Sequence, residues 1–259
     1  YSVVGYKDGK VKLFGKNNNT PLWSYSTGNE IFAVDISSDG EYIVAGSKNE
    51  KAYLFRYNSS SYVWRYDVGN DVYAVSISSD GEYIAVGGKN NKLYFFEGTD
   101  GDPLWTSDEL EGDIVEISIS SDGSYIAVGT DAGNYGYLYL FSKDDAEPVW
   151  VDSTLGVVTS LDIDSDGTNI ALASEDYYVY YYSTSSSSSI WKYDTGNKAT
   201  SVSLSSDGNL LAAGTQNHYL YFFNTSSSQP LWSALTGAAV SSISLTPDGS
   251  DMVVASGKQ

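Results

Sequence analysis

Tryptophan recurs along this chain at a nearly constant spacing, and this repeat restricts the possible folds more than any other feature. Successive Trp residues are 41 residues apart, with one step of 45. The markers are Trp23, Trp64, Trp105, Trp150, Trp191 and Trp232. An Asp-Gly pair keeps the same spacing, at Asp39, Asp80, Asp122, Asp166, Asp207 and Asp248. Internal repeats of this length are typical of arrays in which similar units stack on one another. The sequence therefore predicts six copies of one unit.

Each repeat has the periodicity of β-strands, because its apolar residues alternate instead of recurring every three or four positions. In the run before one Asp-Gly pair, Val75 and Ile77 alternate with Ala74 and Ser76. The Ser-Asp-Gly sequence predicts a tight hairpin, with Asp bonded to its own backbone and Gly at positive φ. A third, aromatic strand and a fourth strand that opens at the Trp complete the repeat. Four sequential strands form a meander, and meanders repeated radially form the blades of a β-propeller.

The order of strand, Ser-Asp-Gly, strand and aromatic strand, as in residues 75–96, resembles a WD40 repeat. The chain departs from that pattern because it lacks the Gly-His pair and ends the third strand with Phe or Tyr instead of Trp-Asp. Trp23 with the nearby Thr27 and Gly28 is closer to the quinoprotein-like type. Over its whole length the chain thus resembles WD40-like and quinoprotein-like (PQQ-like) β-propeller repeat proteins of archaeal or bacterial type. In both families these hallmark residues serve packing.

We expect an all-β chain that forms a single domain over residues 1–259. The expected fold is a six-bladed β-propeller of four-stranded antiparallel blades, closed by strands from both chain ends. Residues 1–26 are predicted to form second, third and fourth strands, and residues 240–256 first and second strands. One second strand, residues 2–5 or 252–255, is then surplus. A seven-bladed ring or a fragment of a longer array is therefore an alternative, and a spare strand could pair with a neighbouring molecule.

Charge and composition favour some partners over others. The 33 acidic and 14 basic side chains give a net charge of −19, which repels nucleic acid and anionic membranes. No apolar run is long enough for direct membrane insertion. The absence of cysteine excludes disulfides, thiolate metal sites and a cysteine nucleophile. The chain begins at Tyr1 without a recognisable signal peptide, which suggests a processed or excised product. Abundant Tyr and Ser with little Lys favour an extracellular or cell-surface location.

Acidic residues at two places suggest cation sites. Asp162, Asp164 and Asp166 match the opening of a calcium loop, in which alternate carboxylates converge on one ion. The match lacks the bidentate Glu, and the segment aligns with the ordinary hairpin of the other repeats, so a structural role is favoured. Asp35, Glu116 and Asp162 lie on predicted first strands and are candidates to line a central channel. A solvated, charge-tolerant lining is the favoured interpretation there too.

Three Asn-X-Ser/Thr sequons fall in the same predicted loop, between third and fourth strands, and are candidates for glycosylation. They begin at Asn18, Asn58 and Asn224. The run of residues 177–182 is the most aromatic strand, and its alternate rings are expected to face opposite sides. Some of those rings could contact a partner or a carbohydrate, although inter-blade packing is the simpler role. His218 is the only histidine, so a catalytic triad is not indicated.

These observations favour a non-catalytic propeller that serves as a rigid interaction or assembly module, binding protein partners or copies of itself. It could belong to a larger surface protein or a filament. One alternative is a propeller that binds a carbohydrate or a cation. The other is a quinoprotein-like enzyme, which the resemblance suggests only through its repeats. No cofactor is expected, because repeats that are near copies leave few unique residues for catalysis.

Overall fold

Residues 1–257 are described in the computed structural model, and they form seven antiparallel sheets of two to four strands without any helix. Repeated four-stranded meanders of this kind fit a β-propeller. The chain packs as two compact units. The first comprises Tyr1–Ile126 and Ser142–Glu147, and the second comprises Ala127–Phe141 and Pro148–Gln259. The single domain over residues 1–259 stays a prediction.

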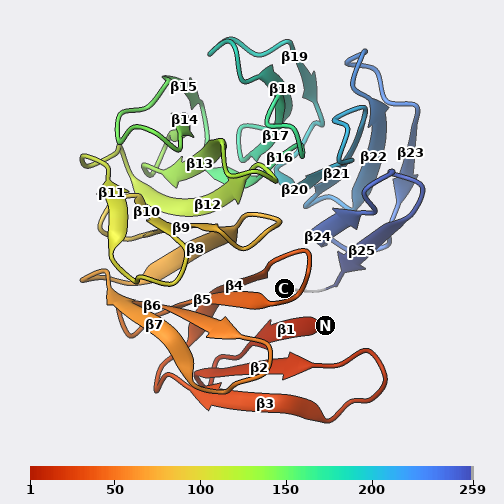
Figure 1. Cartoon of the computed structure of the whole chain (residues 1–259). Helices are drawn as coiled ribbons and strands as arrows, with labels where there is room; N and C mark the ends of the chain where they lie inside the picture. Colours follow the sequence, from red (N-terminus) through yellow and green to blue (C-terminus); the bar gives the residue numbers. More distant parts are fainter. Residues whose placement is uncertain (258–259) are drawn as a thin grey trace. The chain divides into compact units, whose positions relative to one another are not determined.

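The first unit contains three complete sheets whose strands pair in sequence order, drawn from red to yellow in Figure 1. The first sheet has three strands: β1 (Ser2–Gly5), β2 (Lys10–Phe14) and β3 (Pro21–Ser26). The second has four: β4 (Ile31–Ile36), β5 (Tyr42–Ser47), β6 (Lys51–Arg56) and β7 (Tyr62–Asp67). The third also has four: β8 (Val72–Ile77), β9 (Tyr83–Gly88), β10 (Tyr94–Glu97) and β11 (Pro103–Thr106). Strand β12 (Asp113–Ile119) follows, and the division between the units falls within β13 (Tyr125–Asp131).

The second unit repeats the same meander, drawn from green to blue in Figure 1. Strand β14 (Gly136–Ser142) pairs with β15 (Trp150–Thr154). The next sheet contains β16 (Val158–Ile163), β17 (Asn169–Ser174), β18 (Tyr178–Ser183) and β19 (Trp191–Asp194). It is followed by β20 (Ala199–Leu204), β21 (Leu210–Thr215), β22 (Tyr219–Asn224) and β23 (Trp232–Leu235). The last sheet has two strands, β24 (Val240–Leu245) and β25 (Met252–Ser256).

The prediction of six blades is not confirmed, because the described residues form seven sheets. Strands from the two chain ends were expected to share one blade. Instead, β1 to β3 form a three-stranded sheet and β24 with β25 form a two-stranded sheet. One of the two predicted second strands, β1 and β25, was expected to be surplus. Both are present, and β1 pairs with β2 while β25 pairs with β24.

The Ser-Asp-Gly hairpin is confirmed in detail. The Asp39 carboxylate accepts hydrogen bonds from the Ser37 hydroxyl at 2.6 Å and the Glu41 backbone N–H at 2.8 Å. Gly40 has a φ of 74°. A Cβ on Gly40 would also lie 2.8 Å from the Tyr1 ring, so both the backbone conformation and the neighbouring side chain require glycine. This turn sets the register between the first and second strands of its repeat.

The core lies between successive sheets of a unit, and five of the six Trp residues donate a hydrogen bond to the sheet that follows. The ring of Trp64 stacks on Phe96 at 4.9 Å, and its Nε1 donates to the Gly98 carbonyl at 3.3 Å. In the second unit Trp191 donates to the Thr225 carbonyl at 2.7 Å and packs against Phe223. The interpretation of the Trp residues as packing residues is confirmed for these five, whereas Trp232 is 42% exposed and stacks on Phe222 of its own sheet.

A β-bulge, which the sequence pattern did not predict, recurs where first and second strands pair. The register shifts between Ile31 and Ala33 in the first unit and between Val158 and Ser160 in the second. The extra residue of a bulge is not paired with the neighbouring strand, and its side chain points in a different direction. Thr159, the extra residue of the second example, donates its hydroxyl proton to the Ala199 carbonyl of β20 at 2.7 Å.

Candidate functional site

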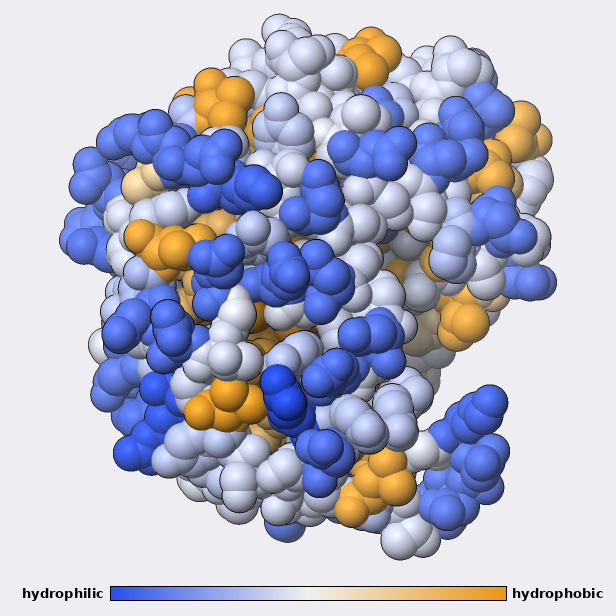
Figure 2. Space-filling model, viewed as in Figure 1, coloured by the Kyte–Doolittle hydropathy of each residue, from blue (hydrophilic) through white to orange (hydrophobic). Residues whose placement is uncertain are grey.

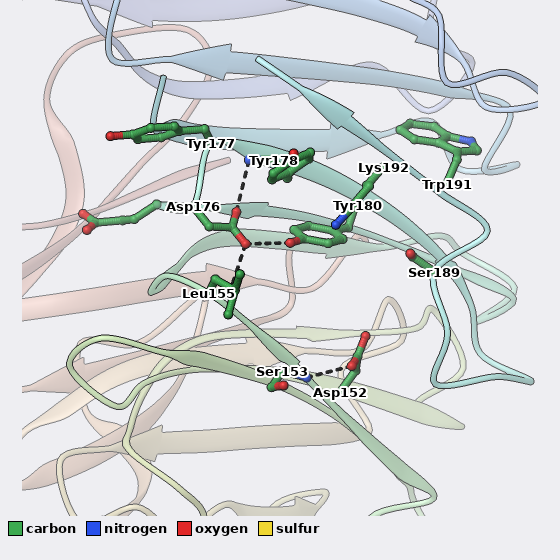
Figure 3. Close-up of a pocket in the computed structure, with 11 residues that line it drawn as sticks. Asp152, Ser153, Leu155, Asp176, Tyr177, Tyr178, Tyr180, Ser189, Trp191 and Lys192 are labelled. Carbon is green, nitrogen blue, oxygen red and sulfur yellow. Dashed lines mark hydrogen bonds between the residues drawn. The ribbon is translucent and has the colours of Figure 1, made fainter. Parts of the chain in front are cut away.

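A groove of about 680 Å³ opens in the second unit, lined by β15, β18, β19 and the turn that precedes β18. Figure 3 shows side chains of these elements around the groove. Those that carry its chemistry are Asp152, Asp176, Tyr177, Tyr178, Tyr180 and Lys192. The groove is therefore lined by carboxylates, phenol rings and one ammonium group.

In three other repeats the corresponding gap between sheets is filled by a tyrosine two residues after the Trp. Tyr25, Tyr66 and Tyr193 hold this position. The ring of Tyr66 lies 5.4 Å from Tyr94 and 5.2 Å from Phe96, measured between centroids. Tyr25 and Tyr193 make the same pair of aromatic contacts with the sheets that follow them. A phenol ring at this position is part of the ordinary packing of the fold.

Strand β15 carries Asp152 at this position, and the missing ring leaves room for the groove. The facing residue changes with it, because Tyr182 stands where the other repeats have Phe55, Phe96 and Phe223. The Tyr182 hydroxyl donates to the Asp152 carboxylate at 3.0 Å, and the Ser153 backbone N–H donates to the other oxygen at 2.8 Å. Where other repeats pack a Tyr ring on a Phe ring, this repeat therefore has an Asp that accepts a hydrogen bond from a Tyr.

A second exchange of residue type lies at the turn before β18. In the third sheet, Asn90 donates its side-chain N–H to the Tyr94 hydroxyl and to the Val68 carbonyl, at 2.7 and 2.8 Å. At the same place in the fifth repeat, Asp176 accepts from the Tyr180 hydroxyl at 2.6 Å and from the Leu155 backbone N–H at 3.2 Å. Figure 3 shows Asp176 and Tyr180 directed toward each other. Asn90 is the donor in the two hydrogen bonds of the third sheet, whereas Asp176 is the acceptor in the two of the fifth repeat. The side chain at the groove is therefore a carboxylate instead of an amide.

The two tyrosine hydroxyls remain protonated donors. Burial raises the pKa of Tyr180 well above its usual range, and the hydrogen bond to Asp176 together with the negative charges nearby raises it further. The pKa of Tyr182 is raised by burial and then by the Asp152 carboxylate. Because both phenols keep their protons, the two carboxylates are held in fixed positions by neutral groups.

Lys192 is the cation of the groove. Its Nζ lies 4.5 Å from the centroid of the Tyr178 ring and 5.7 Å from that of Tyr180, so the ammonium covers the faces of both rings. At the groove's edge, Glu175 pairs with Lys198 at 2.6 Å. Among residues 1–257, the charged groups of the groove that form no ion pair are Asp152, Asp176 and Lys192.

Tyr177 lies at the rim in a backbone conformation that bulky side chains seldom adopt. Its φ is 79°, whereas the residues at the same turn in other repeats are Glu50, Asn91 and His218. The Tyr177 carbonyl accepts hydrogen bonds from the backbone N–H and the hydroxyl of Thr195, at 2.9 and 2.8 Å. The ring is 48% exposed, which makes it the most exposed ring of the 177–182 run. A large aromatic side chain at a left-handed position is an outlier that suggests function.

The aromatic run that the sequence singled out divides as expected between two faces. Tyr181 stacks on Trp191 at 5.3 Å within the core behind β18. Tyr178, Tyr180 and Tyr182 follow one another on the groove side, with adjacent centroids 5.9 and 6.0 Å apart. Most of these rings pack internally, and Tyr177 is the ring that solvent reaches most.

Of the predicted channel-lining residues, Asp35 and Asp162 lie between neighbouring first strands. The Asp35 carboxylate on β4 accepts the Ile77 N–H of β8 at 3.0 Å, and Asp162 on β16 accepts the Leu204 N–H of β20 at 2.8 Å. Burial raises the pKa of Asp35 to about 6, although the N–H donors oppose the shift. Glu116 is half-buried on β12. Both aspartates therefore link adjacent sheets.

The segment that resembles a calcium loop adopts the hairpin of the other repeats. Asp164 is buried and accepts hydrogen bonds from Thr168 and Asn169 through both of its oxygens, at 2.7 to 3.1 Å. It takes the place of the serine or, in the last repeat, the threonine that begins the turn elsewhere, while Asp166 is exposed. Within residues 1–257, His, Cys, Asp and Glu side chains form no group of three or more that could hold a metal ion.

The three sequons lie where the sequence predicted, between third and fourth strands. Asn18 follows β2, Asn58 follows β6, and Asn224 ends β22. All three side chains are exposed. Asn18 accepts the Thr20 N–H at 2.9 Å, and Asn224 accepts the Ser226 N–H at 3.1 Å. Glycosylation at these residues stays a prediction. His218 lies exposed in the turn between β21 and β22.

Sequence reasoning missed Asp152, Asp176 and Lys192. The signal for Asp152 was its place two residues after a Trp, where three repeats have Tyr. The signal for Asp176 was a carboxylate aligned with Asn49, Asn90 and Asn217. Position-by-position comparison of the repeats would have found both. Lys192 carries no such signal, because its position varies among the repeats.

Comparisons with known proteins agree with this architecture. Residues 7–135, just under half of the chain, match a family model described as outer membrane protein assembly factor BamB, a PQQ-type repeat model. No curated protein was matched. None of the described residues forms a helix long and apolar enough to cross a membrane. The match over residues 7–135 and the recurring four-stranded antiparallel sheets along the described chain fit a PQQ-like β-propeller.

Proposed function

We propose that the chain is a rigid, non-catalytic interaction module that binds protein partners or copies of itself outside the cell or at its surface. The observation that carries the proposal is that every repeat exposes an aliphatic side chain immediately before its Trp. These residues are 36 to 60% exposed. They are Leu22, Val63, Leu104, Val149, Ile190 and Leu231.

Packing does not account for these side chains, because they remain exposed while the adjacent Trp, in five of the six repeats, hydrogen-bonds to the sheet that follows. Single exposed apolar residues are common on protein surfaces, but recurrence at one position in all six repeats is not expected from chance exposure. On the face shown in Figure 2, apolar side chains form separate patches among hydrophilic ones. Small, regularly placed apolar contacts suit an interface that uses several repeats at once.

Two further features support an interaction role. The chain has one histidine and no cysteine, and its sheets share most of their turn and packing residues, which leaves few unique groups for catalysis. The matched family model carries the description of an assembly factor for outer membrane proteins. A function in which PQQ-like repeats contact other proteins is in line with that description.

Sedimentation velocity at protein concentrations from about 1 µM to about 1 mM tests self-association. We expect the sedimentation coefficient to rise with concentration. A variant with Val149→Ser, Ile190→Ser and Leu231→Ser should shift the rise to at least about tenfold higher concentration. Thr200→Ser, a half-buried polar position, is the control. A chain that stays monomeric at about 1 mM would refute self-assembly and leave other proteins as the partners.

A further inference from the structure

The groove between β15 and β18 has the space of a missing six-membered ring. Tyr66 and Tyr193 fill the equivalent gaps with phenol rings that lie 5.2 to 5.4 Å from two aromatic neighbours. Asp152 leaves that space open next to Tyr180, which lines the groove, and the Tyr182 hydroxyl donates to the Asp152 carboxylate from within the core. A ligand with one saturated or aromatic six-membered ring therefore matches the vacated volume.

The polar groups around this space require a ligand that both donates and accepts hydrogen bonds. An ionised carboxylate has about four lone-pair sites. Asp152 uses sites for Tyr182 and Ser153, which leaves acceptor capacity toward the groove. Lys192 has three N–H donors and, among residues 1–257, forms no ion pair. Acceptors and a donor thus face one space.

Charge argues against ionic ligands. An anion would lie against two carboxylates, Asp152 and Asp176. A cation would meet the Lys192 ammonium, which already covers the faces of Tyr178 and Tyr180 that could bind it. A neutral ligand that carries several hydroxyls avoids both repulsions, because each hydroxyl can donate to a carboxylate or accept from Lys192.

We propose that this groove binds a neutral pyranose sugar, with Asp152 and Asp176 accepting its hydroxyl protons and Lys192 donating to a sugar oxygen. The pyranose ring takes the place of the phenol that other repeats place between their sheets. The exposed Tyr177 ring at the rim offers an apolar face to a second sugar residue, which accounts for an aromatic side chain at a strained left-handed position. The site does not depend on the interaction role proposed above.

Saturation-transfer NMR with the methyl pyranosides of glucose, galactose, mannose and N-acetylglucosamine tests the proposal. We expect at least one glycoside to bind saturably, with a Kd of about 0.1 to 10 mM, as is reasonable for a ligand of this size. The double variant Asp152→Tyr with Tyr182→Phe recreates the Tyr193–Phe223 pair inside the groove. It should fold, because the next repeat packs in this way, and should bind the glycoside at least about tenfold more weakly.

Two variants make the result decisive. Tyr193→Phe alters the equivalent position outside the groove and should leave binding unchanged. Asp176→Asn recreates the Asn90–Tyr94 pair and should weaken binding even if the filled variant fails to fold. Absence of saturable binding up to about 50 mM of every glycoside would overturn the proposal. Undiminished binding by a folded filled variant, or binding of tetramethylammonium or benzoate at these residues in place of sugars, would also overturn it.

Discussion

The gap beside β7 in the first unit and the gap beside β15 in the second occupy equivalent positions in the repeat and have opposite contents. Beside β7, the Tyr66 ring packs on Tyr94 and Phe96, and the Asn90 amide donates to the Tyr94 hydroxyl. Beside β15, Asp152 replaces the ring and accepts a hydrogen bond from Tyr182. One gap is part of the core, and the other is a groove.

The difference shows how a repeat protein can open a groove without changing its fold. Loss of a packed aromatic side chain ordinarily costs several kcal/mol. Here the facing Phe has become Tyr182, whose hydroxyl gives the new carboxylate a partner. Burial of a polar group costs little when it is hydrogen-bonded and much when it is not. The cavity is therefore tolerated because the residues on both of its sides differ from those of the filled gaps and hydrogen-bond to each other.

The largest expected effect comes from opening the filled gap without that second change. Tyr66→Asp should lower the free energy of unfolding by about 4 kcal/mol, because the ring is lost and Phe96 offers the new carboxylate no hydroxyl. Urea unfolding followed by fluorescence measures this loss. Tyr66→Phe, which keeps the ring, should change the value by less than about 1 kcal/mol. A loss of under about 1 kcal/mol for Tyr66→Asp would show that the ring is not needed.

The second prediction concerns the loss of stability that follows from ionising Asp35, a carboxylate between two sheets of the first unit. The pKa of Asp35 is raised by burial to about 6 from 3.8, so the folded state binds its proton more tightly than the unfolded chain does. Its contribution to stability is full below about pH 4 and is lost as the pH rises to about 6. That loss should reach about 3 kcal/mol at most.

Asp35→Asn should remove this pH dependence, as measured by urea unfolding between about pH 4 and pH 7. The exposed Asp100→Asn is the control and should leave the slope of stability against pH unchanged. If the Asp35→Asn chain keeps the slope of the wild type, the dependence must come from another group.

The third prediction concerns a variant in which an aromatic ring fills the gap beside β15. The double variant Asp152→Tyr with Tyr182→Phe should raise the free energy of unfolding by about 1 to 2 kcal/mol, because it restores ring packing that other repeats use. Differential scanning calorimetry would detect the gain as a higher melting temperature. The single variant Asp152→Tyr, which removes the acceptor of the Tyr182 hydroxyl, should gain less. A clear drop in stability for the double variant would mean that the gap beside β15 has a different shape.

The smallest effect is expected at the groove rim. Tyr177→Asn should stabilise the chain by about 0.5 to 1 kcal/mol, because Asn tolerates the left-handed conformation better than a bulky ring does. His218→Asn, at the same turn of the next repeat, provides the comparison and should also stabilise slightly. Thermal unfolding resolves both changes. Destabilisation by Tyr177→Asn would indicate that the ring has a packing role in the absence of ligand.

Local features of the repeat were predictable because they depend on residues near one another in the chain. The turn at residues 37–40 could be predicted from its Ser, Asp and Gly residues, each with its own preference for such a turn. The placement of the sequons between third and fourth strands followed from the same strand order. The groove could not be read in this way. It depends on Asp152 and Tyr182, which are 30 residues apart and meet only when two sheets pack.

The sequence by itself determined the β meander, its turns and the packing role of the tryptophans, because alternation, turn residues and regular spacing act within one repeat. Only the tertiary structure decided that seven sheets form instead of six and that Asp35 and Asp162 hydrogen-bond to neighbouring strands. It also decided where a cavity opens. Whether a gap is filled depends on side-chain volumes contributed by both sheets, and neither sheet's sequence specifies that sum alone.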